Sequence, residues 1–336
     1  MKLRPEQLRA HLARELDSLY VLTGDEPLLV EEARDAILEA ARARSFDERV
    51  LLTVEPGFAW SRLQEAAGNL SLFAERRIVD LRIPSGKPGK DGGEALARFV
   101  GMLGPELCAV VTLPRVDQQM RRAKWFKTLE GAGRHLAFWP VEAGALPGWV
   151  AHRARAQGLQ LAPEAARFIA ERSEGNLLAA RQELDKLSLL LEPGQVSLES
   201  LVDAVTDNAR FNVFDLGEAV VAGDAARVHR TLCGLREEGV EIVLALWAVT
   251  REVRIFAQAA DSGNLASALQ SAGVPPPRRR PYTPAVRRHQ AEYWRALLAA
   301  CGQVDRAIKG LHPGDPWAGL ERLALCAAGQ TMDTHF

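Results

Sequence analysis

The first 140 residues of the chain alternate between short apolar runs and longer stretches with a helical pattern. The apolar runs are rich in branched and aromatic side chains, which is typical of strands buried in a sheet. They cover residues 19–23, 50–54, 78–83, 109–113 and 136–139, with helical stretches at 27–44, 59–67, 94–103 and 118–129. Strands joined through helices run parallel and are covered on both faces. We therefore predict an α/β domain with a parallel sheet over residues 1–140, with a proline- and glycine-rich surface loop at 84–93.

From about residue 141 the strand signal disappears and the pattern becomes helical. Helices at 163–172, 176–190 and 198–207 predict a small three-helix domain over residues 141–210. The middle helix has an apolar residue at every third or fourth position, the spacing of a buried face. A further helical region, 211–336, contains a longer stripe of the same kind, which predicts a helical bundle. This stripe consists of Ile242, Leu246, Val249, Val253 and Phe256.

The composition excludes several classes of protein. The net charge of −1 creates no global field toward nucleic acid or anionic lipid, so such a contact needs a local patch. The four cysteines lie far apart and form no C-x-x-C pair, which argues against a zinc site and a disulfide framework. The first residues, MKLRPEQLRAHLARELD, lack the apolar segment of a signal peptide, and no apolar run approaches the ~20 residues of a membrane span. We expect a cytoplasmic protein with no membrane contact.

The turn after the first predicted strand is the place to look for a phosphate-binding loop. Such a loop needs several glycines, a Lys for the phosphates and a Ser or Thr for magnesium. Here Gly24 stands alone, and Asp25 and Glu26 follow it. A carboxylate ~4 Å from a phosphate charge would repel it by roughly 4 kcal/mol at an effective dielectric near 20. We instead expect Asp25 to cap a helix whose first turn holds Pro27.

No other catalytic or metal-binding set is evident in the sequence. The third strand offers only Asp80, in mid-strand, where an ATPase would have a pair of acids at the strand end. The seven histidines are scattered without the spacing of a metal site. We therefore expect no catalytic residues, no metal and no cofactor in this chain.

The segment just before the third strand has unusual apolar content. Leu70, Leu72 and Phe73 lie between Gly68 and a charged stretch that contains Arg76 and Arg77. Two alternatives follow from the residues: the three side chains complete the local core, or they form an exposed anchor for another protein.

Three segments together carry a resemblance to a known family: TGDEPLLVEEA after the first strand, NLSLFAERR before the third, and SEGNLLAARQELDKLSLL in the middle region. With this order the chain resembles, over essentially its whole length, the delta subunit of the bacterial DNA polymerase III clamp loader. The resemblance implies an AAA+-like α/β domain (1–140), a helical lid (141–210) and an all-α collar for oligomerisation (211–336). It also implies a subunit without a working ATP site. In the related motor subunits an Arg of the lid helix senses the γ-phosphate, and Leu178 stands at that position here.

In this family the stretch before the third strand contains the clamp-binding element, with a pattern close to Gln-Leu-x-Leu-Phe. Leu70, Leu72 and Phe73 match it, whereas Asn69 replaces the Gln. Full burial of each apolar side chain contributes roughly 1.5–3 kcal/mol. Arg76 and Arg77 would either meet acidic residues at the clamp rim or remain solvated. The implied partners are the sliding clamp (beta), the ATPase and delta-prime subunits, and primer–template DNA in the assembled complex.

A local basic run lies in residues 275–289, which contain five arginines and no acid. Its members are Arg278, Arg279, Arg280, Arg287 and Arg288. They would bind DNA phosphates, form a collar interface or remain solvated. His312, in a tight loop near the end, is a further candidate for DNA contact. Two other functions compete with a clamp-loader subunit: an active AAA+ ATPase, opposed by the missing Lys, and a helical DNA-binding regulator, opposed by the proline-rich setting of the basic run.

Overall fold

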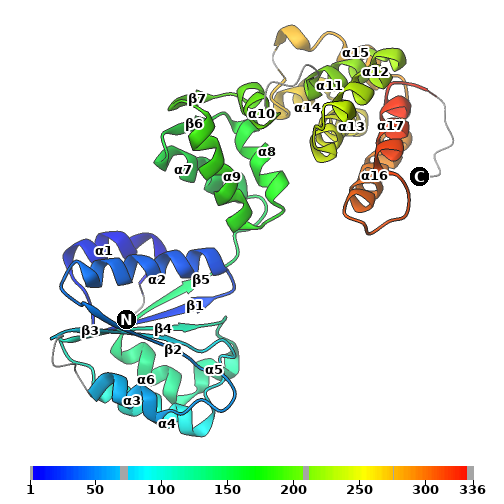
Figure 1. The fold of residues 1–336 in the computed structure, drawn as a ribbon. Helices are drawn as coiled ribbons and strands as arrows, with labels where there is room; N and C mark the ends of the chain where they lie inside the picture. The colour runs from blue at the N-terminus through cyan, green and yellow to red at the C-terminus, as the bar shows by residue number, and fades with distance from the viewer. Residues whose placement is uncertain (1–2, 69–74, 207–211, 275, 331–336) are drawn as a thin grey trace. The chain divides into compact units, whose positions relative to one another are not determined.

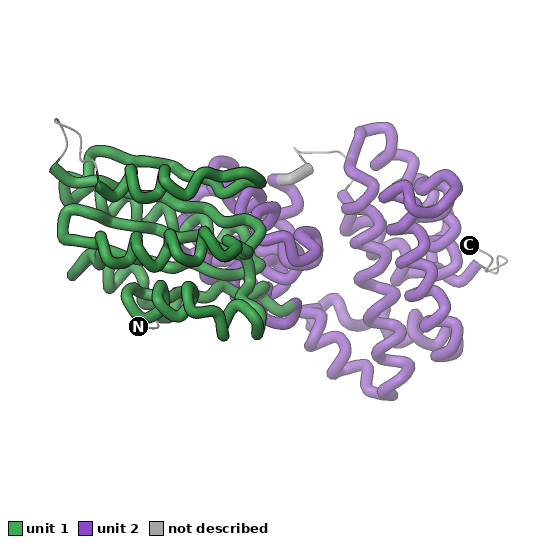
Figure 2. The backbone as a smooth tube through the Cα atoms, turned by 90° about the horizontal axis from the view of Figure 1, so that it is seen from below, with its two compact units in different colours: residues 1–142 green, residues 143–336 purple. Residues whose placement is uncertain are grey.

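The computed structural model describes residues 3–68, 75–206, 212–274 and 276–330. The chain forms two compact units, residues 1–142 and residues 143–336, shown in different colours in Figure 2. Unit 1 holds the large sheet and its helices, and unit 2 is mainly helical. Whether residues 143–336 contain separate lid and collar domains with a boundary near 210 stays a prediction.

Unit 1 is built on a five-stranded sheet in which every strand pair is parallel. The strand order is β2-β3-β4-β1-β5, so β1 lies between β4 and β5 in the interior of the sheet. The prediction of an α/β domain with a parallel sheet is confirmed. The strands are β1 Leu19–Gly24, β2 Glu48–Thr53, β3 Arg77–Arg82, β4 Leu107–Leu113 and β5 Arg134–Phe138.

Helices cover both faces of this sheet, as Figure 1 shows. Successive side chains of a strand point to opposite faces, so β1 contributes Leu19 and Val21 to one core and Tyr20 and Leu22 to the other. A short 3₁₀ turn, Pro5–Gln7, precedes α1. The helices on the Tyr20 face are α1 Leu8–Arg14 and α2 Pro27–Arg42. Those on the Leu19 face are α3 Ser61–Gly68, α4 Gly89–Gly101, α5 Gln118–Arg122 and α6 Lys124–Ala132.

The first part of unit 2 contains the three predicted helices and two features that the sequence did not indicate. One is α7, Leu146–Ala156, and the other is a two-stranded parallel sheet of β6 and β7. The expectation that strands end near residue 141 was therefore wrong. The expected number of three helices was also wrong, because α7 precedes them. Each of these strands has only three residues, too few to show an alternating pattern. The elements are β6 Leu159–Leu161, α8 Pro163–Ser173, α9 Leu177–Leu190, β7 Gly194–Val196 and α10 Leu198–Thr206.

The remainder of unit 2 is helical in its described residues, as predicted. The apolar stripe of α13 is confirmed, because Leu246, Val249, Val253 and Phe256 are all buried. Phe256 packs against Trp294 of α16 with ring centroids 4.7 Å apart. A 3₁₀ turn, Pro276–Arg278, precedes α15. The helices are α11 Val213–Ala222, α12 Ala225–Glu237, α13 Ile242–Ser262, α14 Leu265–Ser271, α15 Tyr282–Val286, α16 Ala291–Ile308 and α17 Pro316–Ala327.

Among the residues that the structure describes, none of the helices is both long and apolar enough to cross a lipid bilayer.

Candidate functional site

The turn between β1 and α2 begins where two strands of the sheet pack closely together. Gly24 is the last residue of β1 and pairs with Phe138 of β5. A Cβ added at Gly24 would lie 2.0 Å from the carbonyl oxygen of Phe138. The glycine is therefore required by the close approach of two neighbouring strands, and this explains it without reference to a phosphate.

The two acids after Gly24 lie in different surroundings. Glu26 is the N-cap residue of α2 and is 8% exposed, and burial raises the pKa of its carboxyl. Asp25 is exposed and lies 3.7 Å from Arg115, whose guanidinium is stacked over the ring of Trp139. The prediction that Asp25 caps α2 was wrong, because the chain enters the helix one residue later. Pro27 does occupy the first turn of α2, as expected.

At the start of α9, Leu178 is the second residue of the helix, and its side chain is 46% exposed. Asn176 caps the helix by accepting a hydrogen bond from the backbone N–H of Ala179 at 3.1 Å. An apolar side chain has no donor for a phosphate, so this position offers no charge to a nucleotide.

The proposed clamp-binding residues Leu70, Leu72 and Phe73, and Asn69 beside them, lie outside the described residues. The two flanks of this segment are described. On one side α3 ends at Gly68, and on the other β3 begins at Arg77.

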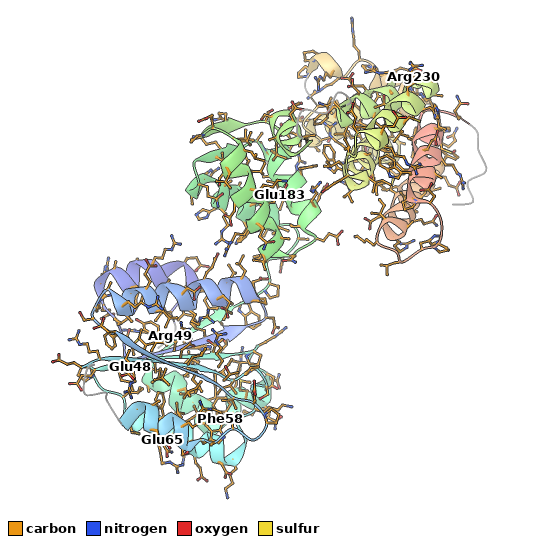
Figure 3. All side chains as sticks on the ribbon, viewed as in Figure 1. Glu48, Arg49, Phe58, Glu65, Glu183 and Arg230 are labelled. Carbon is orange, nitrogen blue, oxygen red and sulfur yellow. The ribbon has the colours of Figure 1, made fainter. Side chains whose placement is uncertain are left out.

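Arg77 connects these flanks and fixes them to the sheet. Its Nη1 donates to the carbonyl oxygen of Ala66 at 2.7 Å, and its Nη2 donates to Glu48 at 2.8 Å. Glu48 lies on β2 beside Arg49 (Figure 3). The side chain of Arg77 is 5% exposed, which places it inside unit 1 rather than at a surface. The expectation of a rim or solvated position for this residue was wrong, because its partners on α3 and β2 are distant in the chain.

Arg76 differs from its neighbour because it is exposed. Its Nη1 donates to the carbonyl oxygen of Arg44 at 2.8 Å, and the guanidinium lies 5.6 Å from the ring centre of Phe46. This residue remains available to a partner that approaches the segment before β3.

The five arginines of residues 275–289 separate into two groups. Three of them have partners in unit 2: Arg278 lies 3.6 Å from Glu199, Arg279 donates to the carbonyl of Val274 at 2.8 Å, and Arg288 donates to the carbonyls of Val220 and Val221. Arg280 and Arg287 form the second group, and both are exposed, as is Arg278. His312 is partly exposed, with its ring nitrogen 2.9 Å from the carbonyl of Pro313.

A buried polar group lies next to the basic run, and the sequence reasoning missed it. Glu252 on α13 is 3% exposed, accepts a hydrogen bond from Tyr282 at 2.7 Å and another from Arg251 at 2.8 Å. Burial raises the pKa of this carboxyl above its usual range. Glu252 lies within the apolar part of its helix, and that position is the sequence signal that marks it.

One group of described residues in unit 1 has the side-chain types of a metal site: His11, Glu15 and Asp17. His11 Nε2 lies 2.7 Å from Asp17 Oδ2, and the same oxygen accepts a hydrogen bond from Arg134 at 2.8 Å. Arg134 also contacts Glu15 at 3.2 Å. Because the guanidinium already supplies the positive charge, this cluster is explained as an ion-pair network.

Comparison with known proteins gives consistent matches. The family model described as "DNA polymerase III, delta subunit" matches residues 20–137. The DNA polymerase III subunit delta of Escherichia coli (strain K12) is 34% identical over 256 residues, covering 76% of this chain and 75% of that protein. The subunit delta of Haemophilus influenzae is 29% identical and covers 74% of this chain and 73% of its own length.

Among solved structures, a Bacillus subtilis DNA clamp loader delta protein has a TM-score of 0.51 at 18% identity. The match covers 97% of the present chain and 100% of the Bacillus subtilis chain. This likeness shows the fold alone, and it agrees with the α/β and helical architecture described above.

Proposed function

Because the chain belongs to the family of DNA polymerase III delta subunits, which are components of the clamp loader, we propose that it binds the sliding clamp through Leu70, Leu72 and Phe73. The three side chains enter an apolar pocket of the clamp and serve as its main anchors. The bound subunit holds one interface of the ring open so that the ring passes onto primed DNA.

One observation supports this choice above the others: a Leu-x-Leu-Phe segment lies between α3 and β3, and Arg77 ties the two flanks together. Fixed flanks reduce the conformational entropy that a segment loses on binding, which favours affinity. The apolar side chains of Leu70, Leu72 and Phe73 supply the desolvation energy typical of interface hot spots. Exposed Arg76 adds charge beside them for an acidic clamp rim.

The same proposal assigns no ATP hydrolysis to this chain. The turn between β1 and α2 has no Lys and no hydroxyl side chain, and its Gly24 is explained by contact with β5. Leu178, at the start of α9, is apolar. The ATPase and delta-prime subunits are then the partners that supply nucleotide-driven change, and primer–template DNA is met in the assembled complex. This role belongs in the cytoplasm, where the chromosome is replicated.

Clamp binding in solution tests the anchor. We expect a Leu72→Ala/Phe73→Ala variant to lose at least ~3 kcal/mol of binding free energy, as two truncated hot-spot residues would. A Leu189→Ala/Leu190→Ala variant is the matched control, because these exposed leucines of α9 lie outside the proposed site. Normal binding by the first variant, or a large fall in its melting temperature, would show that the segment is structural.

Two further measurements test the remaining parts. Titration of the chain with Mg–ATP should give no binding at micromolar concentrations, and saturable binding would contradict a non-ATPase subunit. Ring opening is followed with a fluorophore pair across a clamp interface. A ligand shifts a conformational equilibrium only by its differential affinity for the two states, so tight binding without opening would remove the ring-opening step.

A further inference from the structure

A cysteine, a histidine and a glutamate form a connected set on the surface of unit 2. His229 and Cys233 lie one turn apart on α12, and Glu321 lies on α17, which packs against α12. Nδ1 of His229 is 2.5 Å from Oε1 of Glu321, and Nε2 of His229 is 3.7 Å from Sγ of Cys233. The set involves neither the segment before β3 nor the turn after β1.

The chemistry of the three groups fixes the direction of their hydrogen bonds. An ionised carboxylate only accepts hydrogen bonds, so Nδ1 of His229 must carry the proton that it shares with Glu321. Nε2 of a neutral imidazole then has a free lone pair, and this atom faces the thiol of Cys233. A nucleophile, a base and a group that orients the base are therefore arranged in series, as in enzymes that activate a thiol.

Charged residues of both signs flank Cys233 on α12. Arg230 and Arg236 lie three residues before and three residues after Cys233 on the same helix, which is the spacing of neighbours on a helix face. Figure 3 labels Arg230 on α12. Arg236 is 3.9 Å from Asp315 and lies near the ring of Trp317. Glu237 is an acidic residue one helical turn after Cys233.

Cys233 differs from the other three cysteines of the chain. It is exposed, whereas Cys108, Cys301 and Cys326 are buried. Burial raises the pKa of Cys108 to about 12 and that of Cys301 to about 11, so these thiols stay protonated and unreactive near neutral pH. A thiol reagent added to the folded chain therefore reports on Cys233.

We propose that Cys233 is a modification site that undergoes thiol–disulfide exchange with small-molecule disulfides, with His229 as the base and Glu321 orienting it. Nε2 of His229 takes the thiol proton, and the thiolate attacks one sulfur of the disulfide. A new S–S bond forms to Sγ as the disulfide's own S–S bond breaks. The leaving thiolate takes the proton from the imidazolium, so one disulfide is consumed and one thiol is released for each chain modified.

The test uses oxidised glutathione with the full chain at pH 7 and follows the adduct by intact mass. We expect one adduct per wild-type chain, none on a Cys233→Ser variant, and a rate for His229→Gln reduced about three- to tenfold. Glu321→Gln keeps an acceptor for Nδ1 but loses the charge, so its rate should fall between those of wild type and His229→Gln. His312→Gln is the matched control, since this partly exposed histidine of the same unit contacts no cysteine among the described residues, and its rate should equal that of wild type.

Two outcomes would overturn the proposal. The first is an unchanged rate in a folded His229→Gln variant, because the imidazole would then not act as the base. The second is a wild-type rate equal to that of the same cysteine in urea, where the neighbours of the folded state are absent. Retention of the wild-type melting temperature by each variant confirms that the rates describe the folded chain. Clamp binding by the same samples tests the proposed function independently.

Discussion

Arg77 and Ala66 are joined by a hydrogen bond of 2.7 Å between the Nη1 donor of the arginine and the backbone carbonyl of the last turn of α3. The two residues flank the segment proposed to bind the clamp. Because the same guanidinium also pairs with Glu48 on the edge strand β2, it connects α3, β2 and β3 at one point. The arrangement assigns Arg77 a structural task and leaves Arg76 as the charged residue available to a partner.

Substitution of Arg77 by Met should destabilise unit 1. The change leaves the carbonyl of Ala66 without its donor and removes the partner of Glu48, whose side chain is 31% exposed. Because water can reach that carboxylate, we expect a loss of about 1–3 kcal/mol, below the cost of breaking a fully buried pair. Urea unfolding measures the loss. Arg76→Ala is the matched control, since it removes an exposed arginine next in the chain and should cost less than about 0.5 kcal/mol. Equal stability of the two variants would contradict the assignment of Arg77.

Gly24→Ala tests why a glycine stands at the end of β1. A methyl group there would lie 2.0 Å from a backbone oxygen of β5, so the strands must move apart. We expect a loss of about 2–4 kcal/mol in unfolding free energy, in the range of severe overpacking. Gly131→Ala in α6 is the matched control, because a methyl group there meets open space and should stabilise the helix by about 0.5–1 kcal/mol. A Gly24→Ala variant as stable as wild type would remove the packing explanation.

The strands of unit 1 could be predicted to within two residues because each contains a short apolar run, which is continuous in the buried strands β1 and β4. The start of α4 could not be predicted, because the glycines and prolines of residues 84–93 indicate a loop. In the structure α4 already begins at Gly89, and Gly92 allows the close approach of Trp60, which would lie 2.4 Å from an added Cβ. Similarly, the predicted helix at 118–129 is interrupted at Ala123, whose backbone is extended.

The candidate sites show a related difference between local and distant information. The missing Lys and the apolar Leu178 are local features, so the sequence alone indicates them. The burial of Arg77 depends on Glu48, and the orientation of His229 depends on Glu321, which is 92 residues away. Such pairs form only when distant elements pack together, so they cannot be predicted from a single sequence.

The basic run can be tested in the assembled clamp loader by removing two of its exposed arginines, Arg280 and Arg287. If both contact DNA phosphates, an Arg280→Ala/Arg287→Ala variant should bind primer–template DNA more weakly. The slope of log affinity against log salt should decrease by about 0.9 for each phosphate that the variant no longer neutralises. Arg9→Ala/Arg14→Ala is the matched control, because it removes two exposed charges from α1 of unit 1. An unchanged slope with weaker assembly would favour the collar interface, and no change in either would leave these arginines solvated.

Glu252 should make the stability of unit 2 depend on pH. Burial raises the pKa of this carboxyl above its ordinary value of 4.5, so the folded state binds the proton more tightly than the unfolded state. The stabilisation from this proton is complete below about pH 4.5 and is lost as the pH rises through the higher pKa of the folded state. Relative to a Glu252→Gln variant, which has no such proton, wild type should therefore lose unfolding free energy with rising pH, by at most about 1.4 kcal/mol per pH unit.

Urea unfolding of both proteins from pH 4.5 to 8 measures this difference. The hydrogen bond from Tyr282 lowers the pKa of Glu252, in opposition to burial. A Tyr282→Phe variant should therefore raise that pKa further and extend the sloping region to higher pH. It should also lose about 1–3 kcal/mol, because a buried carboxylate oxygen is left without its donor. A difference between wild type and Glu252→Gln that stays constant across the pH range would show that the folded state does not take up a proton at Glu252.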